Sequence, residues 1–363
     1  MLTLFKDHTE TRSLPPIAAW ARLQWRLALD KGAVPALEAL QREWLKEYAE
    51  LGFPQEEIEL LMRRWEGEWL LPLLQRGDVR EIFAHGPQLV EAVGVERETL
   101  SCPLEKEDWR LWVETLATRL GAECNFGRPC TSTHWEAAGA PWRVTLLHGS
   151  LGPTGMPKVF LRRLSVRPLA WANYQLDAAG AKLLQELVTG RANVLVAGAT
   201  GSGKTSFLST MLAAREEEDH LVVLEDTQEI ACEGTRVTRL LSADRPGRAL
   251  TDLLAHSLRL SPDRIVLGEM RSHEVVPFLL AMNTGHSGVM ATLHASGAAD
   301  ALHRVAQLFT LASGRGEMSY GEVLRLVCRN VGVVVFLEKR RIREVVRVYG
   351  CEGSQPLYDV IWS

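Results

Sequence analysis

The chain has 363 residues, more than a single hydrophobic core usually supports, so we expect two or three domains. Its net charge of −4 and isoelectric point near 6.2 argue against a protein that coats nucleic acid, although they leave room for a local basic groove. The six cysteines form no Cys-x-x-Cys pair, so neither a zinc knuckle nor a small disulfide framework is indicated. We expect free thiols in a reducing cytosol, and a soluble chain, because the longest apolar run, 331–337, is too short to span a bilayer.

Three segments near the N-terminus have apolar residues at helical spacing: 17–27, 37–48 and 58–69. Gly32 and the sequence Gly-Phe-Pro at 52–54 separate them, as helix stop and start signals do. This pattern predicts a helical bundle over residues 1–75. Its tryptophan stripes are more typical of a core than of a ligand platform.

Short strand-like runs follow, at 81–83, 90–95, 143–147 and 158–161, around one helix at 109–120. They predict a small α/β domain over residues 76–168. Ten of the eleven tryptophans precede residue 172, and this change in composition, together with the sequence Arg-Pro-Leu-Ala at 167–170, predicts a linker at 169–175.

In the remaining segment, residues 176–363, strands alternate with helices. We expect strands at 193–197, 221–225 and 264–267, and helices at 177–189, 204–214 and 249–260. Such alternation is typical of a parallel sheet wrapped by helices. Ligands of these sheets bind at the carboxyl ends of the strands.

The sequence GATGSGKT at 198–205 directly follows the first of these strands and matches a phosphate-binding loop. Its glycines let backbone N–H groups surround phosphate oxygens, Lys204 would reach the β and γ phosphates, and the Thr205 hydroxyl would hold Mg²⁺. The alternative is a glycine-rich turn with an incidental lysine. The predicted nucleotide-binding residues are Gly198, Ala199, Thr200, Gly201, Ser202, Gly203, Lys204, Thr205 and Ser206.

Acidic residues end two other predicted strands, Glu225 with Asp226 in one and Glu269 in the other. A carboxylate at that position, downstream of a phosphate loop, indicates a general base or a contact to metal-bound water. Each acid could instead be a helix cap or a surface charge. His286 and His294 flank a further short strand and are expected at the same edge, where they would sense the γ-phosphate, unless they are structural.

Four motifs in this order resemble the secretion ATPases of type II and type IV systems. They are the phosphate loop, an acidic box LEDTQEI (224–230), an atypical Walker B motif LRLSPDRIVLGEMR (258–271) and a histidine box AMNTGHSGVMATLHA (281–295). The Walker B motif has Gly268 where other phosphate-loop enzymes keep an aspartate. The resemblance is strong over 176–345 and weaker over 78–87 and 159–164. The dipeptide at 283–284 and the N-terminal bundle favour the tight-adherence pilus branch, near its conjugation relatives.

The resemblance implies an α/β fold, with a RecA-like ATPase domain over 176–363 behind the bundle and the small domain. It also implies an ATPase that uses ATP and Mg²⁺, assembles as a homo-hexamer, and is cytoplasmic and peripheral at the inner membrane. The ring would act on an inner-membrane platform protein in pilus assembly or protein secretion. No direct nucleic-acid partner is expected.

The same resemblance implies which residues do the chemistry. Thr205 and Glu269 would contact Mg²⁺, directly or through water, and the catalytic set would be Glu225, Glu269, His294, Arg162 and Arg271. Residues 129–135 lack the acidic and arginine residues usual there, so no arginine finger is expected from that stretch. Two alternatives stay open: a nucleotide-gated assembly scaffold without turnover, and a conjugation-type DNA-transfer motor, which would need a basic channel.

Overall fold

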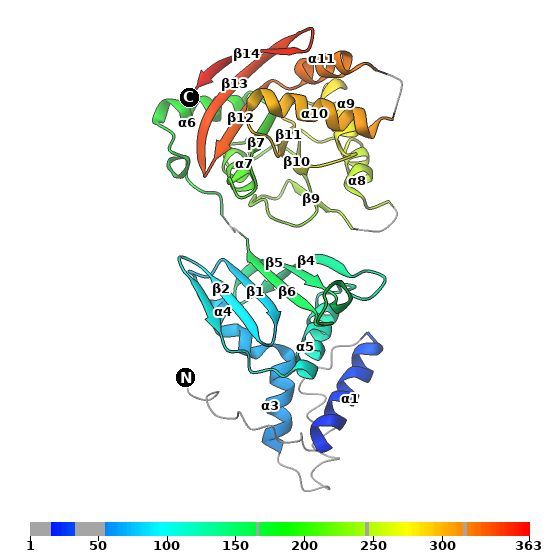
Figure 1. Cartoon of the computed structure of the whole chain (residues 1–363). Helices are drawn as coiled ribbons and strands as arrows, with labels where there is room; N and C mark the ends of the chain where they lie inside the picture. The colour runs from blue at the N-terminus through cyan, green and yellow to red at the C-terminus, as the bar shows by residue number, and fades with distance from the viewer. Residues whose placement is uncertain (1–15, 33–54, 165–166, 244–246, 315–317) are drawn as a thin grey trace. The chain divides into compact units, whose positions relative to one another are not determined.

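The computed structural model describes residues 16–32, 55–164, 167–243, 247–314 and 318–363 (Figure 1). The chain divides into two compact units, Met1–Leu164 and Ser165–Ser363, each with its own sheet and hydrophobic core. The division falls a few residues before the predicted linker. In the structure that linker carries a 3₁₀ helix, η4 (Trp171–Tyr174), whose Tyr174 is buried against Phe207 of the second unit.

The helices of the first unit pack around tryptophans. α1 (Pro16–Asp30) and α3 (Gln55–Glu66) lie near two of the predicted N-terminal helices, and the third, at 37–48, lies outside the described residues. Trp25 and Trp65 are fully buried, with ring centroids 5.4 Å apart. The other helices among the described residues of this unit are η2 (Glu68–Leu70), α4 (Leu71–Gln75), α5 (Lys106–Arg119) and η3 (Gly149–Leu151).

An antiparallel sheet completes the first unit, with strand order β3-β2-β1-β6-β5-β4. Alternate residues such as Ile82, Val144 and Leu161 are buried in one core with Trp109 and Trp112 of α5. The strands are β1 (Glu81–Gly86), β2 (Leu89–Val93), β3 (Arg97–Leu100), β4 (Cys130–Ala137), β5 (Ala140–Leu147) and β6 (Lys158–Arg163).

The second unit is built on an eight-stranded sheet of order β14-β13-β12-β7-β11-β10-β8-β9. The six strands from β12 to β9 run parallel, and β13 and β14 extend the sheet antiparallel. The strands are β7 (Val194–Gly198), β8 (Leu221–Glu225), β9 (Val237–Leu241), β10 (Arg264–Met270), β11 (Met290–Leu293), β12 (Val333–Glu338), β13 (Arg341–Glu352) and β14 (Gln355–Trp362).

Helices cover both faces of this sheet (Figure 1). Val194 and Val196 of β7 pack toward α6 (Ala178–Thr189) and α7 (Lys204–Leu212). Leu195 and Ala197 pack toward the other layer, which holds α8 (Leu250–Ser257), α9 (Val275–Asn283), α10 (Ala298–Ala312) and α11 (Tyr320–Asn330). Because the central strands are parallel, the carboxyl ends of β7, β8, β10 and β11 meet at one edge.

A buried ion pair fixes the amino ends of two of these strands. Asp219 is 2% exposed and accepts a hydrogen bond from Arg264 Nε, and the Arg264 side chain is wholly buried. We expect Asp219→Ala to lower the free energy of unfolding by about 3–5 kcal/mol, because it leaves a buried guanidinium without its counter-charge. Urea denaturation followed by circular dichroism measures this.

The matched control is Glu338→Ala, which removes an exposed carboxylate that pairs with Arg343. Exposed pairs contribute little, so we expect a change of at most about 1 kcal/mol. Equal losses in the two variants would mean that the buried pair does not hold the strands.

Candidate functional site

The predicted phosphate loop lies between a buried strand and a helix. All five residues of β7 are buried, and the chain turns through Gly201 and Gly203, whose φ angles are 74° and 95°. Residues with a Cβ rarely adopt these angles. Gly203 is the N-cap of α7 and supplies no capping side chain, so the first N–H groups of this helix are directed to the loop.

The hairpin between β12 and β13 packs directly on the loop. A Cβ on Gly198 would lie 2.4 Å from the carbonyl oxygen of Leu337, so only glycine fits there. Arg340 N donates a hydrogen bond to Ser202 O at 2.9 Å. The Ser202 hydroxyl is buried and has no hydrogen-bond partner within the described part of the chain, which makes it a polar atom that a bound ligand could satisfy.

Lys204 places its ammonium group inside the loop. The residue is 7% exposed, and Nζ donates to Gly198 O and Ala199 O, each at 2.9 Å. Nζ also lies 3.2 Å from His294 Nδ1. Burial lowers the pKa of Lys204, while the nearby carboxylate of Glu269 acts in the opposite direction.

Glu269 lies beside this ammonium near the carboxyl end of β10. Its Oε1 lies 2.6 Å from His294 Nε2, and its Oε2 accepts a hydrogen bond from Arg271. Burial alone would raise the pKa of Glu269, but Arg271, His294 and Lys204 outweigh burial and lower it. The structure therefore brings three predicted site residues together around the ionised carboxylate of a fourth, Glu269.

Asp226 extends this group. Its Oδ2 accepts a hydrogen bond from Arg271 Nη1 at 3.1 Å, and its Oδ1 accepts one from Ser242 Oγ at 2.6 Å. Arg271 is thus held between two carboxylates, and the Glu269 hydrogen bond is the main reason that its pKa is raised. The sequence drew attention to the acidic pair at 225–226, but it did not select Asp226 as the residue that contacts Arg271.

Glu225 has different partners from Glu269. It is 2% exposed; Oε1 accepts from the backbone N–H groups of Glu229 (2.9 Å) and Ile230 (2.8 Å), and Oε2 accepts from Arg239 at 3.1 Å. Burial raises the pKa of Glu225, although these donors oppose the rise. A Cβ at Gly268 would lie 3.0 Å from Glu225 Cγ, so the missing Walker B aspartate leaves the space in which Glu225 packs. Because the Glu225 side chain is 2% exposed and the Glu269 side chain is 21% exposed, the geometry favours Glu269 over Glu225 for contact with water.

The two predicted histidines lie at opposite edges of the sheet. His294 follows β11 and reaches the phosphate loop, whereas His286 precedes β11, which runs parallel to β7. His286 Nδ1 lies 3.3 Å from Ala281 O, at the amino edge. The prediction that both histidines share the nucleotide edge is wrong for His286.

Arg162 lies in the first unit, on β6. Its side chain is about half exposed, and its Nε lies 3.6 Å from a carboxylate oxygen of Glu81. Its contact with nucleotide stays a prediction.

The described residues hold no group of three or more His, Cys, Asp and Glu side chains that could bind a metal. Magnesium usually takes few protein ligands and completes its shell with phosphate and water oxygens. Thr205, in the first turn of α7, and Glu269, near the carboxyl end of β10, stay the predicted magnesium contacts. Among the described helices, none is long and apolar enough to cross a membrane.

Comparison with known proteins gives the family. Residues 143–356, more than half of the chain, match the model described as Type II/IV secretion system protein. The chain belongs to this family. The conjugal transfer protein TrbB of Rhizobium radiobacter is 31% identical over 254 residues, which are 67% of this chain and 75% of that protein. The type IV secretion system protein VirB11 of Bartonella henselae is 30% identical over 156 residues, which are 42% of this chain and 44% of that protein.

Solved structures of a pilus motor and of an ATPase share the fold of this chain. The pilus retraction motor PilT with bound ADP aligns with a TM-score of 0.58 and 19% identity, over 82% of this chain and 81% of that chain. The ATPase DotB of Legionella pneumophila aligns with a TM-score of 0.56 and 17% identity, over 83% of this chain and 79% of that chain. The predicted RecA-like α/β fold and the predicted family are confirmed. The narrower tight-adherence branch stays a prediction.

The lowered pKa of Glu269 has a consequence for acid stability. Its folded pKa lies below the unfolded value of about 4.3, so its ionisation stabilises the fold above that pH, and this contribution is lost as pH falls through the folded pKa. We expect Glu269→Gln to be less stable than the unmodified chain at about pH 5, and the gap to narrow toward about pH 3. Urea denaturation across this range measures the gap, and a gap that widens toward acid would show that the pKa is not lowered.

Proposed function

We propose that this family member is an ATPase that powers a type IV secretion or conjugal transfer apparatus. The observation that carries the proposal is the convergence of Lys204, Glu269, Arg271 and His294 at the phosphate loop. Family membership and the printed names of TrbB, VirB11 and PilT support it. As part of the same proposal, the chain acts as a homo-hexamer on the cytoplasmic face of the inner membrane, against a membrane platform protein.

Nucleotide binding is the task of the loop and of α7. Backbone N–H groups at the start of α7 and the Lys204 ammonium hold the β and γ phosphates, in a setting where burial strengthens each interaction. Thr205 and Glu269 would hold magnesium, which would supply positive charge to neutralise charge on the phosphate oxygens. Lys204 then exchanges its bonds to loop carbonyls for bonds to phosphate.

Hydrolysis depends on Glu269. Its ionised carboxylate accepts a hydrogen bond from the attacking water and orients it, while Arg271 holds the other carboxylate oxygen. His294 lies between Glu269 and Lys204, where it can contact the γ-phosphate. Most of the catalysis then comes from positioning and from fixed charge.

Two substitutions test this assignment. We expect Lys204→Ala to weaken ATP binding at least about 10-fold, because it removes the charge that holds the phosphates. Glu269→Gln should keep ATP binding but lower turnover at least about 100-fold, because it removes the water-orienting charge. A fluorescent ATP analogue measures binding, and phosphate release measures turnover.

The matched control is Lys182→Ala, which removes an exposed lysine of α6 that pairs with Glu186. It should leave both quantities unchanged. Full turnover in Lys204→Ala or in Glu269→Gln would overturn the assignment, and tight binding without turnover in the unmodified chain would favour the nucleotide-gated scaffold.

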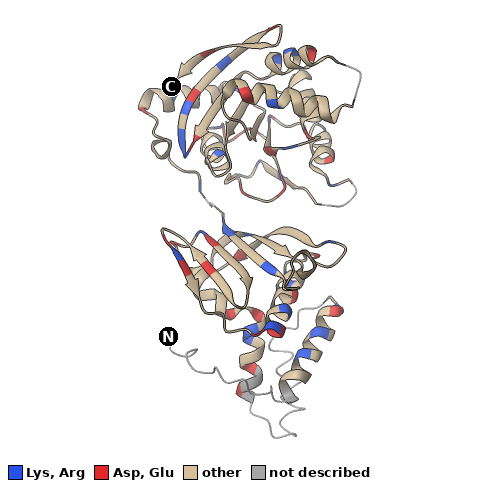
Figure 2. Ribbon diagram, in the orientation of Figure 1, with Lys and Arg blue, Asp and Glu red and all other residues tan. Residues whose placement is uncertain are grey.

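The second candidate is a conjugation-type motor that itself binds DNA, because the relative TrbB is named for conjugal transfer. Lys and Arg lie among Asp and Glu on the ribbons of both units (Figure 2), so we place DNA as cargo of the apparatus rather than as a ligand of this chain. We expect single-stranded DNA to leave turnover unchanged at low salt. Stimulation that disappears at high salt would instead favour direct DNA binding.

Assembly is tested by measuring mass in solution and turnover together over a range of protein concentrations. We expect both to rise as six copies associate. Full turnover by a single chain would contradict the hexamer.

A further inference from the structure

The loop at 226–232, between β8 and β9, is hydrogen-bonded to Arg239, an arginine that lies outside the four sequence motifs. Arg239 lies on β9, opposite Val223 of the parallel neighbour β8. Side chains alternate along a strand, so Val223 and Glu225 lie on one face of the sheet, and Arg239 shares it. Val223 packs in the core beside α7, so Arg239 and Glu225 meet on the α7 side.

Arg239 binds backbone carbonyl groups of this loop, and Glu225 binds its backbone N–H groups. Arg239 Nη2 donates to Ile230 O and Cys232 O, each at 2.8 Å, and contacts Cys232 Sγ at 3.0 Å. Glu225 accepts from the N–H groups of Glu229 and Ile230, and the two side chains are joined at 3.1 Å. Hydrogen bonds to charged groups are stronger than neutral ones, so this pair fixes the loop.

The loop in turn touches the nucleotide site at both ends. Ala231 N donates to Ser209 Oγ at 2.9 Å, and Ser209 Oγ donates to Thr205 O at 3.0 Å, in the first turn of α7. At the start of the loop, Asp226 accepts from Arg271, which is bound to Glu269. One short segment therefore links the magnesium-binding turn with the arginine beside the water-orienting acid.

We propose that Arg239 is a positioning residue for hydrolysis, which clamps the loop at 226–232 to α7 and so keeps Asp226 on Arg271 and Arg271 on Glu269. The kinetic part rests on the function proposed above. The clamp itself is a property of the fold and can be tested without turnover. A guanidinium suits this role because one planar group reaches a carboxylate and two carbonyls.

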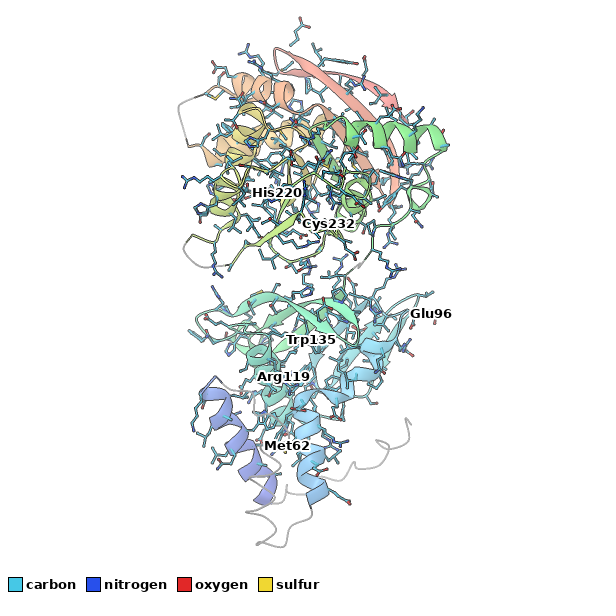
Figure 3. The ribbon with its side chains drawn as sticks, turned by 180° about the vertical axis from the view of Figure 1, so that it is seen from behind. Met62, Glu96, Arg119, Trp135, His220 and Cys232 are labelled. Atoms are coloured by element: carbon cyan, nitrogen blue, oxygen red, sulfur yellow. The ribbon has the colours of Figure 1, made fainter. Side chains whose placement is uncertain are left out.

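Cys232 is a built-in reporter of the clamp. It lies beside β9 (Figure 3), its thiol is partly buried, and burial raises its pKa while Arg239 opposes the rise. Removing Arg239 would by itself slow alkylation, because it leaves less thiolate. Faster alkylation of Cys232 in an Arg239 variant would therefore report that the loop has opened.

The first experiment measures alkylation of Cys232 by iodoacetamide, with peptide mass spectrometry to separate the six cysteines. We expect Arg239→Gln to label Cys232 at least about 10-fold faster, while Cys328, buried in a separate core, stays unchanged. Arg236→Gln is the matched control, because Arg236 is exposed and donates only to Glu218 O among the described contacts. Unchanged labelling of Cys232 in Arg239→Gln would overturn the clamp.

The second experiment measures steady-state ATP hydrolysis in the same variants. We expect Arg239→Gln to lower kcat about 10-fold and to change KM for ATP less than about 3-fold, because the loop orients the acid rather than the phosphates. An unfolded fraction also lowers kcat without changing KM, so kcat is given per folded chain, with the folded fraction measured by circular dichroism.

Arg239→Lys keeps the positive charge beside Glu225 but loses the planar guanidinium group. Its labelling rate and its kcat should therefore lie between those of the unmodified chain and of Arg239→Gln. It also replaces Arg239→Gln if circular dichroism shows that variant unfolded. Faster labelling of Cys232 with unchanged kcat would overturn the positioning role. A chain that hydrolyses no ATP would instead contradict the proposed function, and the labelling would still decide whether the clamp exists.

Discussion

A buried ammonium group is the constraint on which this site depends. Lys204 is almost fully enclosed, and an isolated charge in such a place is costly unless other groups compensate it. Two loop carbonyls accept its hydrogen bonds, and the carboxylate of Glu269 supplies the opposite charge nearby. These partners come from β7 and β10, so the compensation requires parallel strands whose ends meet at one edge.

The same strand order explains which predictions from the sequence were correct. The strands β7, β8 and β10 are near-continuous apolar runs, because both of their faces are buried. The edge strand β9 is only partly buried along its length, and β4 is rich in Thr and Ser, so neither gives a clear apolar pattern. The phosphate loop could be located because its glycine spacing is a local requirement.

The partners of individual side chains were harder to predict. Alternation along β8 sends Glu225 to the α7 side, and the adjacent Asp226 meets Arg271, a contact that depends on the neighbouring strand. The sequence does not show which of two successive acids will do so. His286 is a different case, because its position before β11 already indicated the amino edge, and the shared motif with His294 hid that signal.

The contact between the phosphate loop and the β12–β13 hairpin has a consequence for synthesis. Gly198 packs on Leu337 and Ser202 bonds to Arg340, residues far later in the chain. The flanking strands of β7 are β11 and β12, which also emerge late from the ribosome. A nascent chain therefore carries an apolar strand with both edges unpaired until most of the second unit has been made, and such delayed, long-range pairing slows folding and exposes the chain to aggregation. The phosphate loop therefore has all of its contacts only in a nearly finished chain.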